Sequence, residues 1–258
     1  MNKIFDTMKA AVFDMDGTLL DSMPMWHTVS DKYLEGKGIQ PPAGLWDNVK
    51  RLTEIETANY FISNFGIKDP IERICADFRS IIAFEYHNKL QLKDGAKELL
   101  QHLNSKGIPC VLATATNRPC VDACLARLGI APLFTEVLTC LELDTTKKEP
   151  LIFERAAEIC GALPSEAVIF EDALHCIRTA KNAGFAVCAV YDKSSDEITE
   201  PPESDWDRIK KIADCTVNSL TEIIPQQSRH WAHSRRLAWT GSHSLWTLCA
   251  NPKHHLRY

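Results

Sequence analysis

Two patterns of hydrophobic and polar positions alternate along much of the chain. Short apolar runs bounded by polar residues, glycine or proline predict buried strands, whereas apolar residues three or four positions apart predict helices. The predicted strands are residues 10–13, 108–114, 137–139, 167–170, 185–190 and 215–217. The helices predicted between them are residues 95–106, 119–128, 151–159 and 173–183. Strands that alternate with helices in this way indicate a parallel sheet with helices on both faces.

Residues 22–88 depart from this alternation, because they carry helical periodicity and few strand signals. Helices are predicted at 25–34, 52–65 and 71–86, the last of them starting after Pro70. The sequence therefore predicts a helical insert between the first strand and the rest of the sheet.

The composition is that of a globular protein: 45% of the 258 residues are hydrophobic and 24% are charged. A net charge of −5 gives no overall field that favours nucleic acid, so no nucleic-acid partner is expected. No segment approaches the ~20 apolar residues of a membrane span, so no membrane association is expected. The ten cysteines are scattered, with no Cys-x-x-Cys pair. That usage favours a cytoplasmic location.

The C-terminal segment differs in charge from the rest of the chain. From Arg229 onward there are five lysines or arginines and no acid, which leaves residues 1–228 with 24 basic and 34 acidic residues. Residues 225–258 are predicted to be a basic, His- and Trp-rich tail outside the core, poorly ordered because they lack a patterned apolar face. A metal-binding or nucleic-acid-binding arm is the alternative, prompted by His230-x-x-His233 and Arg235-Arg236.

Two carboxylates, Asp14 and Asp16, directly follow the first predicted strand, and Gly17 and Thr18 come next. A strand that ends in this way delivers its acids to the edge where open α/β sheets bind ligands. Two acids so close together repel each other, and a hard cation such as Mg²⁺ offsets that repulsion. An aspartate can also attack phosphorus, while a second acid protonates the leaving oxygen.

Three further positions with complementary chemistry follow later strands or loops. Thr114 ends a strand, and its hydroxyl can bind a phosphoryl oxygen. Lys147 or Lys148 can neutralise charge between a nucleophile and a phosphoryl group. Glu171 and Asp172 follow another strand and supply oxygen ligands for Mg²⁺.

This arrangement closely resembles the haloacid dehalogenase superfamily over roughly residues 8 to 224. The signature at residues 14–18 is that of its phosphoryl-transferring members. Phe170-Glu171-Asp172-Ala173, followed by Ala180-x-x-Ala183-Gly184, is similar to the fourth motif of the subgroup with β-phosphoglucomutase and many small-molecule phosphatases. The resemblance implies an α/β fold: a Rossmann-like parallel sheet flanked by helices, with an inserted helical cap domain. The core domain would comprise residues 1–21 and 89–224, and the cap residues 22–88.

The resemblance also implies a role for each candidate residue. Asp14 would be the nucleophile and a metal ligand, and Asp16 the general acid and base, with its backbone carbonyl on the metal. Thr114 would bind the phosphoryl group, and Glu171 and Asp172 would complete a Mg²⁺ site. The expected catalytic residues are Asp14, Asp16, Thr114 and Lys147. The expected phosphate-binding residues are Gly17, Thr18, Thr114, Ala115 and Lys147, and the expected metal ligands are Asp14, Asp16, Glu171 and Asp172.

The implied function is a Mg²⁺-dependent phosphatase for a small phosphorylated metabolite, such as a sugar phosphate. A phosphomutase of the β-phosphoglucomutase type is an alternative, which needs a second phosphate site in the cap; Lys32, Lys50 and Arg51 are candidates for it. Dehalogenation is disfavoured by Asp16, which family members that act on carbon–halogen bonds generally lack. A non-catalytic binding module on the same scaffold is a further alternative. The oligomeric state is left open.

Overall fold

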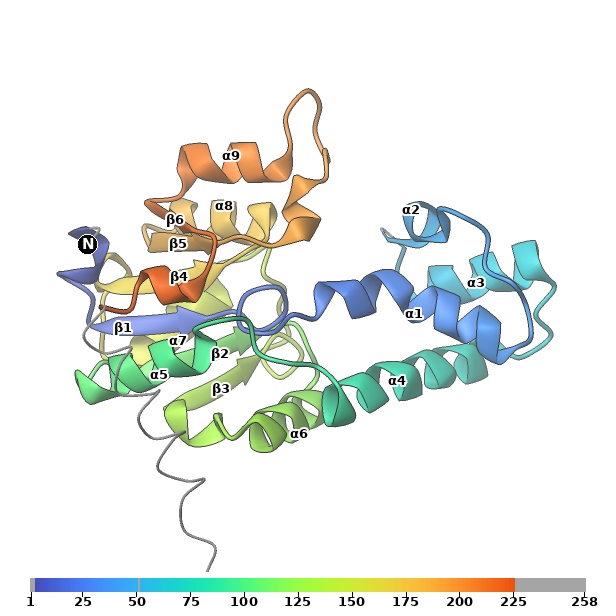
Figure 1. Ribbon diagram of the computed structural model, residues 1–258, viewed down its shortest axis with the longest axis horizontal. Coiled ribbons are helices and arrows are strands. Elements are labelled where there is room, and N and C mark those ends of the chain that lie inside the picture. The colour runs from blue at the N-terminus through green and yellow to red at the C-terminus, as the bar shows by residue number, and fades with distance from the viewer. Residues whose placement is uncertain (1–2, 51, 226–258) are drawn as a thin grey trace, which may run out of the picture. The chain divides into compact units, whose positions relative to one another are not determined.

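The computed structural model describes residues 3–50 and 52–225. Within them, six parallel strands form one sheet in the order β3-β2-β1-β4-β5-β6 (Figure 1). The strands are β1 (Ala10–Phe13), β2 (Cys110–Thr114), β3 (Glu136–Thr139), β4 (Ala167–Glu171), β5 (Ala186–Val190) and β6 (Cys215–Val217). The strand order reverses between β1 and β4, and ligands of open α/β sheets bind at the carboxyl ends beside such a switch point. The predicted α/β class with a Rossmann-like sheet is confirmed.

Alternate residues of the central strands pack into two different hydrophobic cores. Phe13 and Phe170 are register partners on one face, where their rings stack at 4.4 Å. That face is covered by α5 (Ala96–Ser105) and α6 (Arg118–Leu128). The opposite face, with Val12 and Ile169, packs against the remaining helices of the sheet region. These are α7 (Leu151–Ile159), α8 (Leu174–Asn182) and α9 (Asp205–Ile212).

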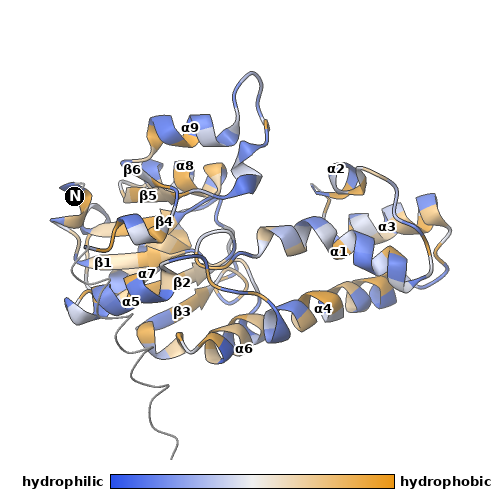
Figure 2. Cartoon of the chain, viewed as in Figure 1, coloured by the Kyte–Doolittle hydropathy of each residue, from blue (hydrophilic) through white to orange (hydrophobic). Residues whose placement is uncertain are grey.

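The hydropathy of the elements agrees with this layering. Figure 2 shows the strands mostly on the hydrophobic side of the scale, whereas α5 and α9 carry both hydrophobic and hydrophilic residues. Strands buried on both faces read as continuous apolar runs rather than as alternating ones, and all of β1 and β2 is buried. The sheet is therefore the rigid base from which the loops at its carboxyl edge are held.

The chain between β1 and α5 is helical. It forms α1 (Met23–Gly36), α2 (Leu45–Val49), α3 (Glu54–Phe65) and α4 (Ile71–Asn88), drawn on the right in Figure 1. Three aromatic rings join α1, α3 and α4: Tyr33 stacks on Phe61 at 5.4 Å and on Phe78 at 4.7 Å. Both ends of this helical region return to the carboxyl side of the sheet, since α1 begins soon after Asp16 and α4 packs on α6.

Among residues 3–50 and 52–225, the α-helices α2 and α9 were not predicted from the sequence pattern. Each helix and strand that was predicted is present, with bounds within about two residues of those expected. A compact unit spans Met1–Ile224, and a second spans Pro225–Tyr258. Apart from Pro225, the second unit lies outside the described residues, and so does the predicted tail.

Candidate active site

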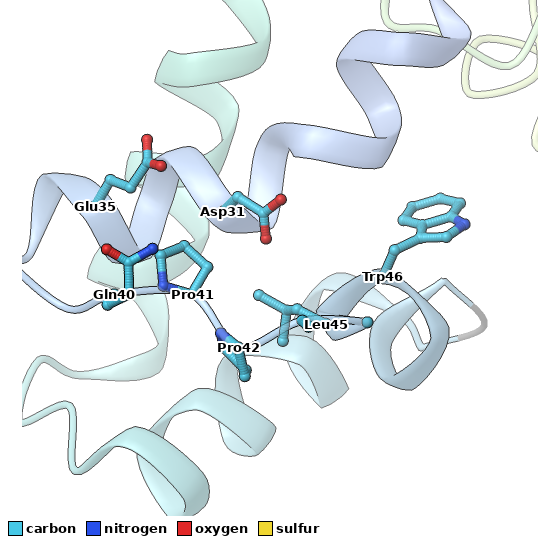
Figure 3. A pocket seen from close by; sticks show the side chains of 9 residues that line it. Asp31, Glu35, Gln40, Pro41, Pro42, Leu45 and Trp46 are labelled. Atoms are coloured by element: carbon cyan, nitrogen blue, oxygen red, sulfur yellow. The ribbon is translucent and has the colours of Figure 1, made fainter.

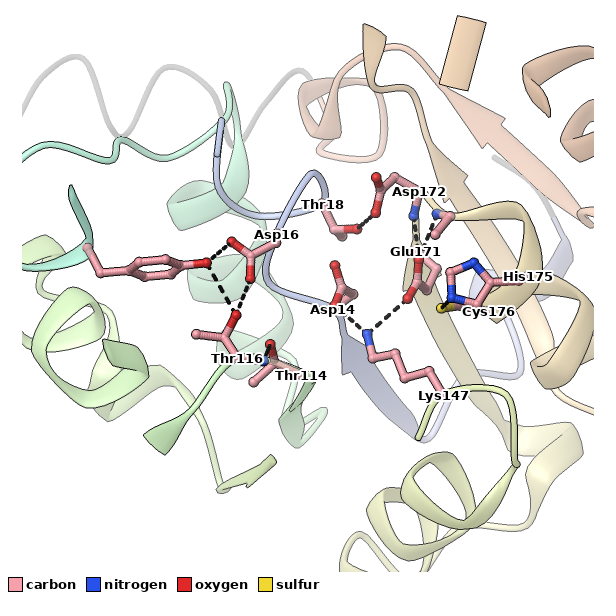
Figure 4. A network of polar contacts seen from close by, with 12 residues as sticks. Asp14, Asp16, Thr18, Thr114, Thr116, Lys147, Glu171, Asp172, His175 and Cys176 are labelled. Carbon is pink, nitrogen blue, oxygen red and sulfur yellow. Dashed lines mark hydrogen bonds and ion pairs between the residues drawn. The ribbon is translucent and has the colours of Figure 1, made fainter. Parts of the chain in front are cut away.

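The carboxyl ends of three neighbouring strands bring most of the predicted residues together (Figure 4). Asp14 directly follows β1, and its backbone N–H donates to the carbonyl of Phe170 on β4 at 3.0 Å, so the ladder continues one residue past the strand. Glu171 ends β4, and Thr114 ends β2 on the other side of β1. Parallel pairing of these apolar strands thus sets the spacing of the polar groups that follow them.

Lys147 lies between two of the carboxylates. Its ammonium group donates to Oδ1 of Asp14 and to Oε1 of Glu171, the latter at 2.9 Å. Its side chain is only 6% exposed, whereas Lys148 is exposed. The geometry therefore places Lys147, and not Lys148, among the acidic groups.

Asp14, Glu171 and Asp172 form a buried acidic cluster. Each offers a carboxylate oxygen, and these oxygens lie within 4.8 Å of one another. The second oxygen of Glu171 accepts the backbone N–H groups of Asp172 and Ala173, both at 2.8 Å, which fixes its orientation. A compact set of carboxylate oxygens is the donor set that Mg²⁺ prefers, so the residues present fit that ion.

Burial governs the charge of this cluster. It raises the pKa of Asp14 to about 7, against the opposing charge of Lys147. Burial, with the negative charges of Glu171 and Asp14, also raises the pKa of Asp172 well above its ordinary value. For Glu171 burial acts in the same direction, but Lys147 and the N–H of Ala173 outweigh it, and its pKa is lowered. A divalent cation held by these oxygens would offset the cost of ionising all three.

The loop after β1 passes very close to Asp172. Gly17 has a φ of +84°, and a Cβ there would lie 2.7 Å from Cγ of Asp172, so only glycine fits. Thr18 donates its hydroxyl hydrogen bond to Oδ1 of Asp172 at 3.1 Å. The side chain of Thr18 thus contacts a carboxylate of the acidic cluster, and its role in phosphate binding stays a prediction.

At the end of β2, the Thr114 hydroxyl accepts the backbone N–H of Thr116 at 3.1 Å, and Ala115 is exposed between them. Asp16 is not part of the acidic cluster. Its carboxylate instead contacts two side chains that the sequence reasoning missed, Tyr86 and Thr116. Alternation along the chain from Thr114 would have indicated Thr116, but Tyr86 is read in the sequence as one more apolar position of a helix.

A surface cavity of about 400 Å³ lies within the helical insertion. It is lined by residues of α1, α2 and the loop between them, among them Asp31, Glu35 and Trp46 (Figure 3). None of the predicted site residues lines it. Among residues 3–50 and 52–225, no helix has both the length and the apolar character needed to cross a membrane.

Strand-end carboxylates with a buried lysine, on a parallel sheet with a helical insertion, define an α/β enzyme of the kind that the sequence resembles. The model of the haloacid dehalogenase-like hydrolases matches residues 8–184. The chain belongs to this family, and the prediction of an enzyme of this family is confirmed.

Relatives with curated names agree with this assignment. The mitochondrial (DL)-glycerol-3-phosphatase 1 of Arabidopsis thaliana is 30% identical over 225 residues, which cover 84% of this chain and 72% of the relative. The phosphorylated carbohydrates phosphatase of Thermotoga maritima is 27% identical over 177 residues, or 69% of this chain and 82% of the relative. These names are in keeping with the predicted class, a phosphoric monoester hydrolase.

A solved structure shows the same fold. The crystal structure of a candidate β-phosphoglucomutase from Thermotoga maritima superposes with a TM-score of 0.70 at 24% identity, over 81% of this chain and 94% of that one. At this identity the likeness establishes the architecture and not the reaction.

Proposed function

We propose that the protein is a Mg²⁺-dependent phosphatase that hydrolyses a small phosphorylated metabolite through an aspartyl-phosphate intermediate. The observation that carries the proposal is the position of Asp14. Its carboxylate lies at the sheet edge, bonded to Lys147 and within 4.8 Å of Glu171 and Asp172. The two phosphatase relatives act, by their names, on glycerol 3-phosphate and phosphorylated carbohydrates, which supports a substrate of this class.

The roles of the side chains follow from their chemistry. Asp14 attacks phosphorus and forms the acyl phosphate, while Asp16 gives a proton to the departing oxygen. Asp16 then takes a proton from the water that attacks the acyl phosphate, which returns Asp14 and releases phosphate. Lys147 and the hydroxyl of Thr114 bind phosphoryl oxygens. When bound to Asp14, Glu171, Asp172 and the carbonyl of Asp16, Mg²⁺ supplies positive charge that keeps Asp14 ionised and polarises the phosphoryl group.

The helical insertion, α1–α4, would serve as the cap. Its position between β1 and α5 in the chain puts both of its connections beside the carboxylates, so it can cover the leaving group and exclude water. The cytoplasmic location favoured by the cysteine pattern stays a prediction.

Charge pairing in the cap favours a phosphatase over a phosphomutase. A mutase needs a second phosphate site, for which Lys32 and Lys50 are candidates. Lys32 pairs with Glu85 at 2.8 Å, and Lys50 pairs with Glu197 at 3.0 Å, so both ammonium groups already face carboxylates. Arg51, the third candidate, lies outside the described residues. A coupled assay that follows glucose 1-phosphate and glucose 6-phosphate separates the two reactions.

Replacing Asp14 tests the proposal directly. Asp14→Asn keeps the shape of the side chain but removes the nucleophile, so turnover of p-nitrophenyl phosphate with Mg²⁺ should fall on the order of 10⁴-fold or more. Asp122→Asn is the matched control, because Asp122 is 60% exposed and pairs only loosely with Arg118 at 3.8 Å; it should keep full activity.

Two results would count against the proposal. If Asp14→Asn turned over substrate as fast as the wild type, Asp14 would not be the nucleophile. No hydrolysis by the wild type across a panel of phosphorylated metabolites, with or without Mg²⁺, would favour the non-catalytic binding module.

A further inference from the structure

The carboxylate of Asp16 is held through both of its oxygens. The hydroxyl of Tyr86 donates to Oδ1 at 2.5 Å, and that of Thr116 donates to Oδ2 at 2.6 Å. The two hydroxyl oxygens lie 3.2 Å apart, so the three groups form a closed triangle of polar contacts. A carboxylate restrained at both oxygens has little freedom to rotate.

Tyr86 is itself held in place by burial of its side chain and by hydrogen bonds to its backbone. Its side chain is fully buried near the end of α4, and its backbone carbonyl accepts hydrogen bonds from Nε and Nη2 of Arg127 at 3.3 and 3.1 Å. Arg127 belongs to α6, and its Nη2 also donates to the carbonyl of Leu90 at 2.5 Å. The backbone of Tyr86 is thus held by α6 at the point where the helical insertion ends.

The direction in which Asp16 is turned matters for the reaction. Figure 4 shows its side chain directed toward Thr116 and away from Asp14. Phosphoryl transfer proceeds with the attacking and leaving oxygens roughly in line, on opposite sides of phosphorus. A group that protonates the leaving oxygen must therefore lie away from the nucleophile, and the contacts with Tyr86 and Thr116 keep Asp16 in that direction.

We propose that Tyr86 is a positioning residue for proton transfer by Asp16, with Thr116 as its partner on the second oxygen. This inference rests on the proposed phosphatase function and adds to it a residue from the helical insertion. Tyr86 is fully buried, so it acts through Asp16 and not by touching the substrate. Because Tyr86 lies near the end of α4, the orientation of Asp16 depends on the segment that joins the helical insertion to the sheet.

The test compares two phosphate esters of similar shape in the presence of Mg²⁺. p-Nitrophenyl phosphate has a good leaving group that needs little protonation, whereas phenyl phosphate has a poor one that depends on the acid. Tyr86→Phe should lower kcat for phenyl phosphate about 10- to 100-fold, since misplacing a catalytic group costs up to about 10². It should lower kcat for p-nitrophenyl phosphate at most about threefold, with KM unchanged. Thr116→Val should show the same split.

Tyr33→Phe is the matched control. It removes the same atom from another buried tyrosine, whose hydroxyl has no hydrogen-bond partner among the described residues. It should leave kcat for both esters unchanged. Retained turnover of p-nitrophenyl phosphate by Tyr86→Phe shows that this variant is folded.

The outcomes separate this inference from the proposed function. If the wild type hydrolyses neither ester, the proposed function fails. If the wild type is active and Tyr86→Phe slows both esters by the same factor, Tyr86 is merely structural and the inference is overturned. Unchanged kinetics in Tyr86→Phe, as in Tyr33→Phe, would overturn it as well.

Discussion

At the scale of single residues, Lys147 decides the charge balance of the site. Its ammonium is the positive partner of both Asp14 and Glu171 in a region shielded from water. Removing one partner of a buried charge pair leaves the other charge uncompensated, which is far more costly than losing a surface pair. The neighbouring Lys148 offers a comparison in which only exposed charge is lost.

Lys147→Met should therefore lower kcat by about 10² to 10³, the usual cost of removing one electrostatic stabiliser. Lys148→Met should stay within about twofold of the wild type, because exposed charges contribute little. Steady-state hydrolysis of p-nitrophenyl phosphate at saturating Mg²⁺ measures both. Equal losses in the two variants would show that Lys147 has no special place in the reaction.

The same pair shows what the sequence can and cannot reveal about a site. The strand-end residues Asp14, Thr114 and Glu171 were predictable because buried apolar strands have recognisable ends. Residues 147 and 148 lie in a loop, where no periodicity indicates which side chain points inward. Tyr86 was missed for another reason: its contact with Asp16 spans 70 positions and depends on tertiary packing.

At the scale of elements, the strands and long helices were predictable, whereas α2 and α9 were not. The helix α2 spans only Leu45–Val49, which is too short for a 3.6-residue period to repeat. In α9 the apolar residues Trp206, Ile209 and Ile212 pack on the core, but the helix has only about two turns and its other five residues are charged, so the apolar pattern is too short to stand out in the sequence. The exact position of a helix also depends on contacts between residues far apart in the chain, which a local sequence pattern does not show.

Gly95, which precedes α5, makes a long-range contact of this kind. It has a φ of +84°, and a Cβ there would lie 2.5 Å from the backbone nitrogen of Thr221 in the 3₁₀ turn Leu220–Glu222. Gly95→Ala should destabilise the protein by about 2–4 kcal/mol, from a left-handed conformation and steric overlap together.

Gly107, just beyond the other end of α5, is the matched control for Gly95. It also has a positive φ, +73°, but open space around the missing Cβ. Gly107→Ala should cost only about 1–2 kcal/mol, from the left-handed conformation alone. Urea unfolding of both variants measures the difference, and equal losses would show that the contact with Thr221 adds nothing.

At the scale of the whole molecule, the order of the strands links distant parts of the chain. Asp14 follows β1, whereas Glu171 and Asp172 belong to β4 and the residue after it, and β1 and β4 are neighbours in the sheet. The acidic cluster exists only when these strands are paired. An ion that binds the cluster therefore binds the folded state and not the unfolded chain, and it stabilises the fold as a whole.

Mg²⁺ should consequently raise the melting temperature of the wild type. At a concentration about 100 times its Kd, the gain is about 2.7 kcal/mol, which corresponds to a rise of roughly 5–10 °C for a protein of this size. Asp172→Asn removes one charged ligand and should abolish most of the rise, whereas Asp122→Asn, on the surface, should keep it. Calorimetric scans with Mg²⁺ and then with excess EDTA measure the shift without any assay of turnover. An equal rise in Asp172→Asn would mean that the ion binds elsewhere, and the acidic cluster would then need another explanation for its three buried carboxylates.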